Sequence, residues 1–415
     1  MEWEIVMGLE VHVELATKTK IFCSCTTEFG GAPNTHCCPV CTGMPGTLPV
    51  LNKKVLEYAV KAGLALNCEI TKYNKFDRKN YFYPDLPKAY QISQLYLPFA
   101  RDGHVDLVTK SGKEKTVRIH EIHMEEDAGK LVHSAFGDAT FPDYNRCGVP
   151  LIEIVSEPDF RSSEEVIAYL EKLKSTFEYL GISDCKMQEG SMRADVNLSV
   201  RPKGTEKFGT RTEMKNINSF KAIERAIAFE SQRQIEVIES GEKIVQETRR
   251  WDDNKGKTFA MRSKENAQDY RYFPEPDIPP VSISDETIKA YNEARPEWAD
   301  EKVVRYGTEF GIAKADAEII AGSKYLARLF EGTVAICHNP KEVRYWIMMQ
   351  IMYFMNERGV QPENITLSPE KFAQFVSIVA ADRINKQTGK TVFEAMFFAD
   401  GDFDVEKYIK DNGLE

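Results

Sequence analysis

The sequence predicts an α+β protein with two domains: a large β-rich cradle with an antiparallel sheet over residues 1–290, and an all-α helical domain over residues 291–405. Segments with alternating apolar and polar residues dominate the first part of the chain, and the apolar spacing becomes helical after about residue 285. The Pro-rich segment 274–280 (PEPDIPP) is typical of a domain edge. A chain of 415 residues is long enough for such cores.

The first predicted strand contains GLEVHVEL at residues 8–15. Apolar residues occupy the odd positions from Trp3 to Leu15, which gives the strand one apolar face. The other face carries Glu10, His12 and Glu14 side by side. In a single strand, the simplest interpretation of this row is the solvated face of a half-buried sheet.

Four further predicted strands also have one polar face. Because alternate residues of a strand point to the same face, each of the following groups shares one face: Glu121, His123 and Glu125; Glu153, Val155 and Glu157; Arg193, Asp195, Asn197, Ser199 and Arg201; Glu213 and Lys215. Asn216, Asn218 and Ser219 follow the last group. Several such faces together are typical of a cavity wall, although ordinary surface strands remain an alternative. A cluster of Glu and His suits a hard divalent ion such as magnesium.

Three helices are predicted within the β-rich domain. The first covers residues 53–66. The second covers 163–179, with Ser162 or Ser163 as its N-cap and an end near Gly181. The third covers 220–240, with Ser219 at its start and Gly241 as its C-cap.

The composition limits the classes of function. A formal net charge of -10 argues against a protein that coats nucleic acid through bulk electrostatics, although a local basic surface can still bind RNA. No apolar run reaches membrane-spanning length, and the N-terminus lacks the plan of a signal peptide. We therefore expect a cytoplasmic protein without a membrane partner.

Five of the nine cysteines lie within residues 23–41. In a reducing compartment this clustering indicates a metal rather than disulfides. Two knuckles, Cys23-x-Cys25 and Cys38-x-x-Cys41, supply four thiolates for a closed, structural zinc site. Cys37 is then a spare thiol, and His36 is a weaker candidate ligand. The alternative is a set of reduced cysteines without metal, and the remaining cysteines are expected to be buried: Cys68, Cys147, Cys185 and Cys337.

Known nucleotide-binding motifs are missing. GKT occurs at 256–258 and 389–391, but Trp251 and Ile384 stand where a Walker A loop needs glycine. No G-x-G-x-x-G follows a predicted strand. A nucleotide site in this protein would therefore have an unfamiliar form.

Taken together, eight segments resemble one family, the B subunits of tRNA-dependent amidotransferases. They are GLEVHVEL, CPVCTGMPGTLPVLN, FDRKNYFYPDLPKAYQISQ, HMEEDAGK, PLIEIVSEPD, MQEGSMRADVNLSVRP, EMKNINSF and DYRYFPEPD. The resemblance covers residues 1 to about 280 closely and the helical part more loosely. Several of these segments exceed eight residues, so chance similarity is remote.

The resemblance implies one subunit of an ATP-dependent ligase that uses glutamine as amido donor. Such a subunit converts misacylated Glu-tRNA(Gln), Asp-tRNA(Asn) or both to Gln-tRNA(Gln) and Asn-tRNA(Asn). It phosphorylates the side-chain carboxylate with ATP and Mg²⁺, and ammonia then displaces the phosphate. An amidase-type A subunit supplies the ammonia, and a small C subunit completes the heterotrimer.

The resemblance also implies site residues. His12, Glu125 and Glu153 match the family's magnesium ligands, and Glu10 and Lys79 join them as catalytic residues. The implied nucleotide pocket adds Tyr81, Ser191, Arg193, Asp195, Asn197, Glu213, Lys215, Asn216 and Asn218 to Lys79. Lys79, with Arg193 and Lys215 as helpers, can neutralise phosphate oxygens during attack by a carboxylate.

Two rival classes and one departure from the family remain. A zinc-stabilised scaffold could position tRNA without catalysis, but it has no need of buried carboxylates. A zinc hydrolase is disfavoured because cysteines would fill all four zinc positions. Family members continue into a C-terminal tail domain that grips tRNA, so residues 406–415 are expected to begin that tail, and this chain is expected to bind tRNA weakly.

Overall fold

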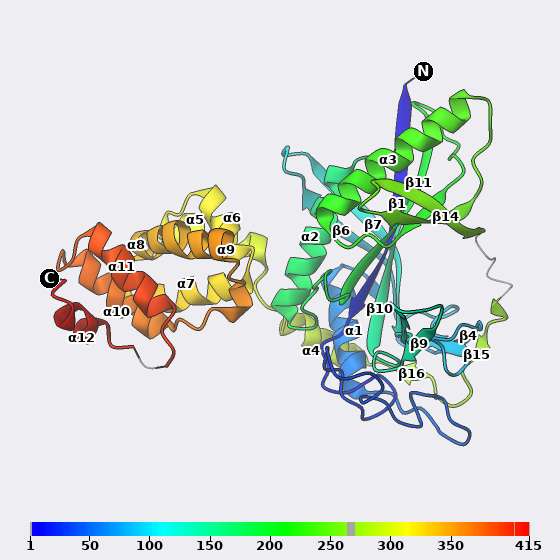
Figure 1. Cartoon of the computed structure of the whole chain (residues 1–415), viewed down its shortest axis with the longest axis horizontal. Coiled ribbons are helices and arrows are strands. Elements are labelled where there is room, and N and C mark those ends of the chain that lie inside the picture. Colours follow the sequence, from blue (N-terminus) through cyan, green and yellow to red (C-terminus); the bar gives the residue numbers. More distant parts are fainter. Residues whose placement is uncertain (1, 264–269, 402, 415) are drawn as a thin grey trace. The chain divides into compact units, whose positions relative to one another are not determined.

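The computed structural model describes residues 2–263, 270–401 and 403–414 (Figure 1). The chain divides into two compact units, Met1–Arg295 and Pro296–Glu415. The division lies a few residues beyond the predicted boundary at 290. The first unit combines sheets with helices, and the described elements of the second are helical, which confirms the predicted α+β class.

The first unit is built on a nine-stranded sheet in the order β14-β13-β12-β11-β1-β10-β7-β6-β2. Its strands are β1 (Trp3–Glu14), β2 (Glu69–Ile70), β6 (Ala100–Val108), β7 (Glu114–Glu126), β10 (Pro150–Ser156), β11 (Met192–Pro202), β12 (Thr212–Lys215), β13 (Glu247–Asp252) and β14 (Lys257–Ser263). Neighbouring strands are antiparallel except β12 and β13, which pair in parallel. The predicted antiparallel sheet therefore contains one parallel pair.

Three helices accompany the sheet: α1 (Lys53–Ala65), α2 (Ser163–Leu180) and α3 (Phe220–Glu239) (Figure 1). Their apolar faces share one core cluster with the alternate apolar residues of β1, β10 and β11. All three predicted helices are present. Ser162 and Ser219 accept hydrogen bonds as the N-caps of α2 and α3, and α2 ends at the left-handed Gly181. The helix α3 is capped at Ser240, and Gly241 follows with positive φ.

Small sheets complete the first unit. The strands β4 (Asp77–Asn80), β5 (Tyr90–Ser93) and β15 (Phe273–Pro274) form one; β3 (Tyr73–Asn74) pairs with β16 (Val281–Ser282), and β8 (Lys130–His133) with β9 (Thr140–Asp143). The Pro-rich segment 274–280 connects β15 to β16, so it lies inside this unit rather than at its edge. The last helix of the unit, α4 (Asp285–Glu293), packs against α1.

The second unit contains α5 (Ala299–Phe310), α6 (Lys314–Ala321), α7 (Lys324–Cys337), α8 (Pro340–Trp346), a π-helical segment (Ile347–Ile351), α9 (Met352–Arg358), a 3₁₀ turn (Pro362–Asn364), α10 (Pro369–Ala380), α11 (Lys386–Phe397) and α12 (Val405–Asp411). These helices enclose a separate core around Trp346, Phe354 and Phe393. Val405 and Ile409 of α12 belong to this core, although a tail domain was expected to begin at residue 406. Each helix in the described part of the chain is too short or too polar to cross a bilayer.

Candidate functional site

A row of polar side chains crosses four adjacent strands of the large sheet. His12 on β1 lies opposite Arg193 on β11 and opposite Glu153 on β10, and Glu153 lies opposite His123 on β7. The apolar neighbours of these residues point into the core on the other face, as the alternation of the sequence requires. The predicted polar faces therefore meet in one place.

His12, Glu125 and Glu153 present their ligand atoms within 4.8 Å of one another. His12 Nε2 lies 3.6 Å from Glu125 Oε1 and 3.5 Å from Glu153 Oε2. Ser93 Oγ donates a hydrogen bond to Glu125 Oε2 at 3.3 Å and orients that carboxylate. Two carboxylates and an imidazole at these separations fit the coordination shell of a divalent cation.

The charges of this cluster stabilise one another. Burial opposes protonation of His12, but Glu153 and Glu125 outweigh it and raise the pKa of His12 to about 8. The pKa of His123 is also raised, because burial is outweighed by Glu153 and by hydrogen bonds to neighbouring carboxylates. Burial disfavours ionised Glu153, yet the two histidines hold its pKa well below the usual value. The Glu153 carboxylate is therefore ionised at neutral pH, and a cation that binds to His12 must displace the proton from its imidazole.

A cavity of about 420 Å³ opens over the cluster. It collects most of the residues predicted from the sequence: His12, Lys79, Tyr81, Glu125, Glu153, Arg193, Asp195, Lys215, Asn216 and Asn218. Lys79 reaches it from β4, with Nζ 4.8 Å from the ring centre of Tyr270 and 5.5 Å from that of Tyr81. Both rings contact this ammonium in the cavity that Glu125 and Glu153 also line.

A second group of carboxylates lies on the same face of the sheet, beside the first. Oxygen atoms of Glu10, Asp195 and Glu213 lie within 4.8 Å of one another, and Lys215 Nζ contacts Asp195 at 2.5 Å and Glu213 at 3.3 Å. Burial disfavours the charged ammonium of Lys215, but Asp195 and Glu213 outweigh it and raise the pKa of Lys215 above its usual value. The lysine therefore keeps its charge at neutral pH.

The polar face continues into a neighbouring cavity of about 450 Å³. Glu10 and Asn197 line this cavity rather than the first one, together with Val6, Gly8 and Ser199. Asn197 Nδ2 donates to Glu10 Oε1 at 3.0 Å. Along β1 the face thus changes from charged at His12 to uncharged at Gly8 and Val6.

Two residues named from the sequence lie away from this cluster: Ser191, which the resemblance implied for the nucleotide pocket, and Glu157, which the strand period aligned with Glu153. Ser191 lines a third cavity with Glu14 and Asp184, and its Oγ donates to Asp184 at 2.5 Å. Glu157 follows a register shift between β10 and β7 and pairs with His120 at 2.9 Å. Ser191 precedes the first residue of β11 and Glu157 follows the last residue of β10, so the alternation of the strands does not extend to them.

The structure adds residues that the sequence analysis did not assign to the site. His123 Nε2 lies 2.9 Å from Glu153 Oε2, and Asp127 Oδ2 accepts from Arg193 Nη2 at 2.8 Å. Gln91 and Asp127 line the cavity over the cluster. The alternation of β7 already placed His123 on the same face as Glu125, so the sequence contained a signal for His123. Nothing in the sequence distinguished Asp127 from a residue of an acidic loop.

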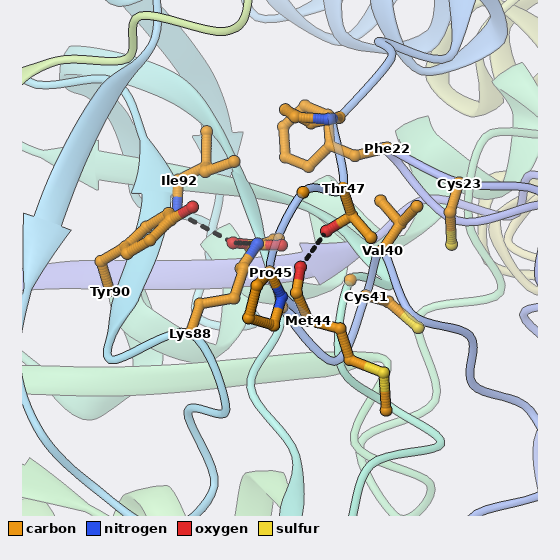
Figure 2. Close-up of a pocket in the computed structure, with 15 residues that line it drawn as sticks. Phe22, Cys23, Val40, Cys41, Met44, Pro45, Thr47, Lys88, Tyr90 and Ile92 are labelled. Carbon is orange, nitrogen blue, oxygen red and sulfur yellow. Dashed lines mark hydrogen bonds and ion pairs between the residues drawn. The ribbon is translucent and has the colours of Figure 1, made fainter.

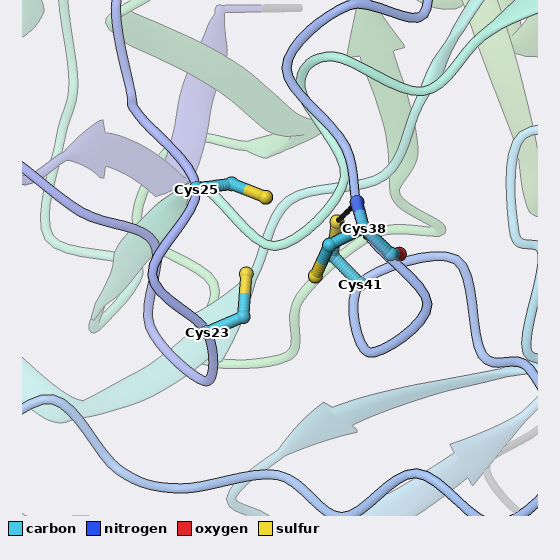
Figure 3. Close-up of side chains that lie close together, drawn as sticks. All are labelled: Cys23, Cys25, Cys38 and Cys41. Atoms are coloured by element: carbon cyan, nitrogen blue, oxygen red, sulfur yellow. Dashed lines mark hydrogen bonds between the residues drawn. The ribbon is translucent and has the colours of Figure 1, made fainter.

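The side chains of Cys23, Cys25, Cys38 and Cys41 converge from two loops (Figure 3), with their sulfur atoms within 4.8 Å of one another. A tetrahedral zinc site with bonds of about 2.3 Å places its sulfur atoms about 3.8 Å apart, so the four thiols fit the ion. Cys37 is outside this group, and its Sγ lies 3.4 Å from the carbonyl oxygen of Asn34.

The other cysteines differ from one another in burial. Cys68, Cys147 and Cys185 are buried, as predicted. Cys337 is half-buried, so the prediction of a buried side chain was wrong at that position. It is the last residue of α7, where the helix ends and its side chain is only partly covered.

A cavity of about 220 Å³ separates the cysteine loops from β5. Figure 2 shows Cys41 and Val40 on one side of it and Lys88 and Tyr90 on the other. Lys88 forms an ion pair with the buried Glu126, the neighbour of Glu125. The cysteine loops therefore form one wall of a cavity that also reaches β7, the strand that carries Glu125 of the His12–Glu125–Glu153 cluster.

Two family models match the chain: the GatB/GatE catalytic domain over residues 5–289, and the GatB domain over residues 328–415. The chain is 62% identical to the B subunit of the aspartyl/glutamyl-tRNA(Asn/Gln) amidotransferase of Lachnoclostridium phytofermentans, over 99% of this chain and 86% of the relative's length. Its identity to the proteins of the same name from Lachnospira eligens and Caldicellulosiruptor saccharolyticus is 61% and 56%, over 100% of this chain and 86% of each relative. The cation cluster and the cysteine centre both lie in the part that the catalytic model matches, and the chain belongs to the GatB/GatE family.

Proposed function

We propose that this chain is the B subunit of a glutamine-dependent amidotransferase that converts misacylated Glu-tRNA(Gln), Asp-tRNA(Asn) or both to the correctly amidated species. The names of its relatives support this activity. The observation that carries the proposal is the convergence of His12, Glu125 and Glu153 with Lys79 in one cavity. Buried carboxylates around a lysine suit phosphoryl transfer, whereas a tRNA-binding scaffold does not need them.

His12, Glu125 and Glu153 would hold Mg²⁺, which neutralises phosphate oxygens when it is bound. Lys79 Nζ provides a second positive charge in the same cavity. Arg193 is fixed by Asp127, and Lys215 by Asp195 and Glu213, so both cations keep defined positions. Together these groups lower the repulsion between a substrate carboxylate and the phosphates of ATP.

The two cavities along β1 suit the two ends of a nucleotide. Phosphates would lie over His12, Lys79 and Arg193, and the base and ribose over Gly8 and Val6. Strand residues rise about 3.3 Å each, so the distance from His12 to Gly8 is about 13 Å, comparable with an extended nucleoside triphosphate. The remaining nucleotide residues, Glu10, Asn197, Glu213, Asn216 and Asn218, border this path. Ser191 would act only through the loop that it fixes.

The rest of the assembly follows from this activity. We propose an amidase-type A subunit and a small C subunit as partners in a heterotrimer, with misacylated tRNA as substrate. Ammonia from the A subunit would displace phosphate from the activated carboxylate. We also propose a cytoplasmic location, because the substrate of this activity is an aminoacyl-tRNA used in translation. The four cysteines would hold a structural Zn²⁺, since a closed set of thiolates leaves no position for a substrate.

The test measures the phosphorylated aminoacyl-tRNA intermediate, formed by the purified complex with ATP and misacylated tRNA but without glutamine. Glu125→Gln preserves the shape of the side chain and removes its charge. We expect intermediate formation to fall by roughly a hundredfold or more, because the lost charge acts on the transition state. Glutaminase activity of the A subunit and binding of tRNA should persist.

Glu114→Gln is the matched control, because Glu114 is an exposed carboxylate at the other end of the same strand. It should leave every rate unchanged. Formation of the intermediate at the wild-type rate by the Glu125→Gln complex would assign this cavity to different chemistry.

A further inference from the structure

Lys20 is buried throughout its length, with no exposed surface. Its backbone N–H donates to the carbonyl oxygen of Cys25 at 3.0 Å, and its Nζ donates to the carbonyl oxygen of His36 at 2.7 Å and to Cys41 Sγ at 3.5 Å. The same residue therefore contacts the first cysteine knuckle through its backbone and the second through its ammonium.

Residues from two other segments lie next to Lys20. Gly148 has a φ of +81°, and a Cβ built there would lie 3.6 Å from Lys20 Cδ and 3.5 Å from Cys41 Cβ. Asn52 Nδ2 donates to the carbonyl oxygen of Lys20 at 3.3 Å and fixes the backbone on the other side. The lysine is thus enclosed between the two knuckles and the loop that precedes β10.

A buried ammonium is costly unless an anion lies next to it. A carbonyl oxygen supplies only a partial charge, so the sulfur of Cys41 is the anionic partner that this arrangement offers. Four thiolates around one zinc ion carry an excess of negative charge, which a neighbouring cation stabilises. The positive charge of the Lys20 ammonium and the negative charge of the four thiolates therefore stabilise each other.

We propose that Lys20 is the charge-balancing partner of the four-cysteine centre and that it controls how firmly the second knuckle holds the zinc ion. This inference rests on the zinc site of the proposed function. Groups that hydrogen-bond to metal ligands alter metal affinity by about ten- to a hundredfold, which sets the expected size of the effect.

The experiment follows the release of zinc to a coloured chelator in the intact complex. Lys20→Met keeps the length of the side chain and removes its charge, and zinc release should accelerate about tenfold or more. Lys20→Gln keeps a hydrogen-bond donor without the charge and should give an intermediate rate. Lys18→Met is the matched control, since Lys18 is exposed two residues earlier, and it should release zinc at the wild-type rate.

If the wild type and Lys20→Met each bind one zinc ion and release it at the same rate, this inference is overturned and the zinc assignment stands. A folded wild-type chain that contains no zinc would overturn the zinc assignment itself. The two failures are therefore distinguishable.

A double-mutant cycle gives a readout that does not depend on zinc release. Cys41→Ser leaves the Lys20 ammonium without its anion, so adding Lys20→Met should raise the melting temperature of that variant. In the wild-type background the same substitution should lower it. A decrease of equal size in both backgrounds would show that Lys20 and Cys41 are not coupled.

Discussion

Glu14 and Asp127 are two carboxylic acids in hydrogen-bond contact beside the cation cluster. Burial and the charge of Asp127 raise the pKa of Glu14 to about 8. Burial also acts on Asp127, but Arg193 and Arg146 outweigh it and lower its pKa. At neutral pH Glu14 therefore keeps its proton and donates it to an ionised Asp127, which in turn positions Arg193.

Glu14→Gln should therefore stabilise the protein increasingly as pH rises. The folded chain binds the Glu14 proton up to about pH 8, while the unfolded chain loses it near pH 4.5, so the wild type loses stability across this window. Glutamine donates the same hydrogen bond without titrating. Thermal melts at pH 5, 6.5 and 8 should show a growing advantage of the variant, and an advantage that does not change with pH would contradict this assignment.

At the residue scale, the alternation of β1, β7 and β10 was sufficient to predict that His12, Glu125 and Glu153 each lie on the polar face of a strand. It could not show which strands are neighbours, since β1 and β10 are far apart in the sequence yet adjacent in the sheet. The resemblance to a family brought the three residues together as one predicted metal site. Asp127 lies just beyond the end of β7, two residues after Glu125, but the acidic run 125–127 is equally typical of a solvated loop.

At the scale of the strand, one face of β1 has an uncharged stretch at Gly8 and Val6 between the charged residues Glu10 and Glu4. His12, Glu10 and Gly8 lie opposite Arg193, Asp195 and Asn197 on β11. Gly8 has no side chain, so it leaves the floor of the second cavity open. Glycine inside a strand is often a place where a ligand approaches the backbone closely.

Gly8→Val should therefore raise the KM for ATP, by about tenfold, because two methyl groups would enter the space proposed for the base and ribose. A Cβ at this position meets only ordinary contacts, the nearest 3.6 Å from Pro158 Cα, and valine favours strands, so the fold should persist. Gly8→Ala is the graded control and should have a smaller effect. Initial rates of ATP-dependent amidation over a range of ATP concentrations provide the measurement, and an unchanged KM in both variants would exclude this cavity as part of the nucleotide site.

Elements were predicted most accurately where the local signal was strong. The capping serines and the amphipathic spacing predicted α2 and α3 almost to the residue. The parallel pairing of β12 with β13 was not predicted, because it depends on α3 carrying the chain from one end of the pair to the other.

At the scale of the whole molecule, the chain has two hydrophobic cores with no shared residue among those described. The change in apolar period near residue 285 indicated two domains, but it could not fix the boundary. The helix α4 has a helical sequence and nevertheless packs against α1 of the first unit. Local periodicity identifies a helix without identifying the core that it joins.

The second unit has its own ion-pair network near its start. Glu297 bonds Arg305 and Lys302, and both cations also contact Glu331 on α7. Hydrogen bonds from Arg305, together with Lys302, lower the pKa of Glu297 to about 2. Through Lys302 and Arg305, the network connects α5 and the segment before it to α7.

Residues 296–415 should therefore fold without the rest of the chain and give one cooperative thermal transition by circular dichroism. A fragment of residues 328–415, which is the extent of the second family match, provides the contrast. It lacks Tyr306, Ile320 and Leu326, which are buried in the same core as Trp346, and it also loses α5 and its ion pairs. We expect this shorter fragment to be helical but without a cooperative transition, because removing large buried side chains leaves the remaining core open to water. If both fragments melted cooperatively at the same temperature, α5 and α6 would be dispensable to this core, and the unit would begin at α7.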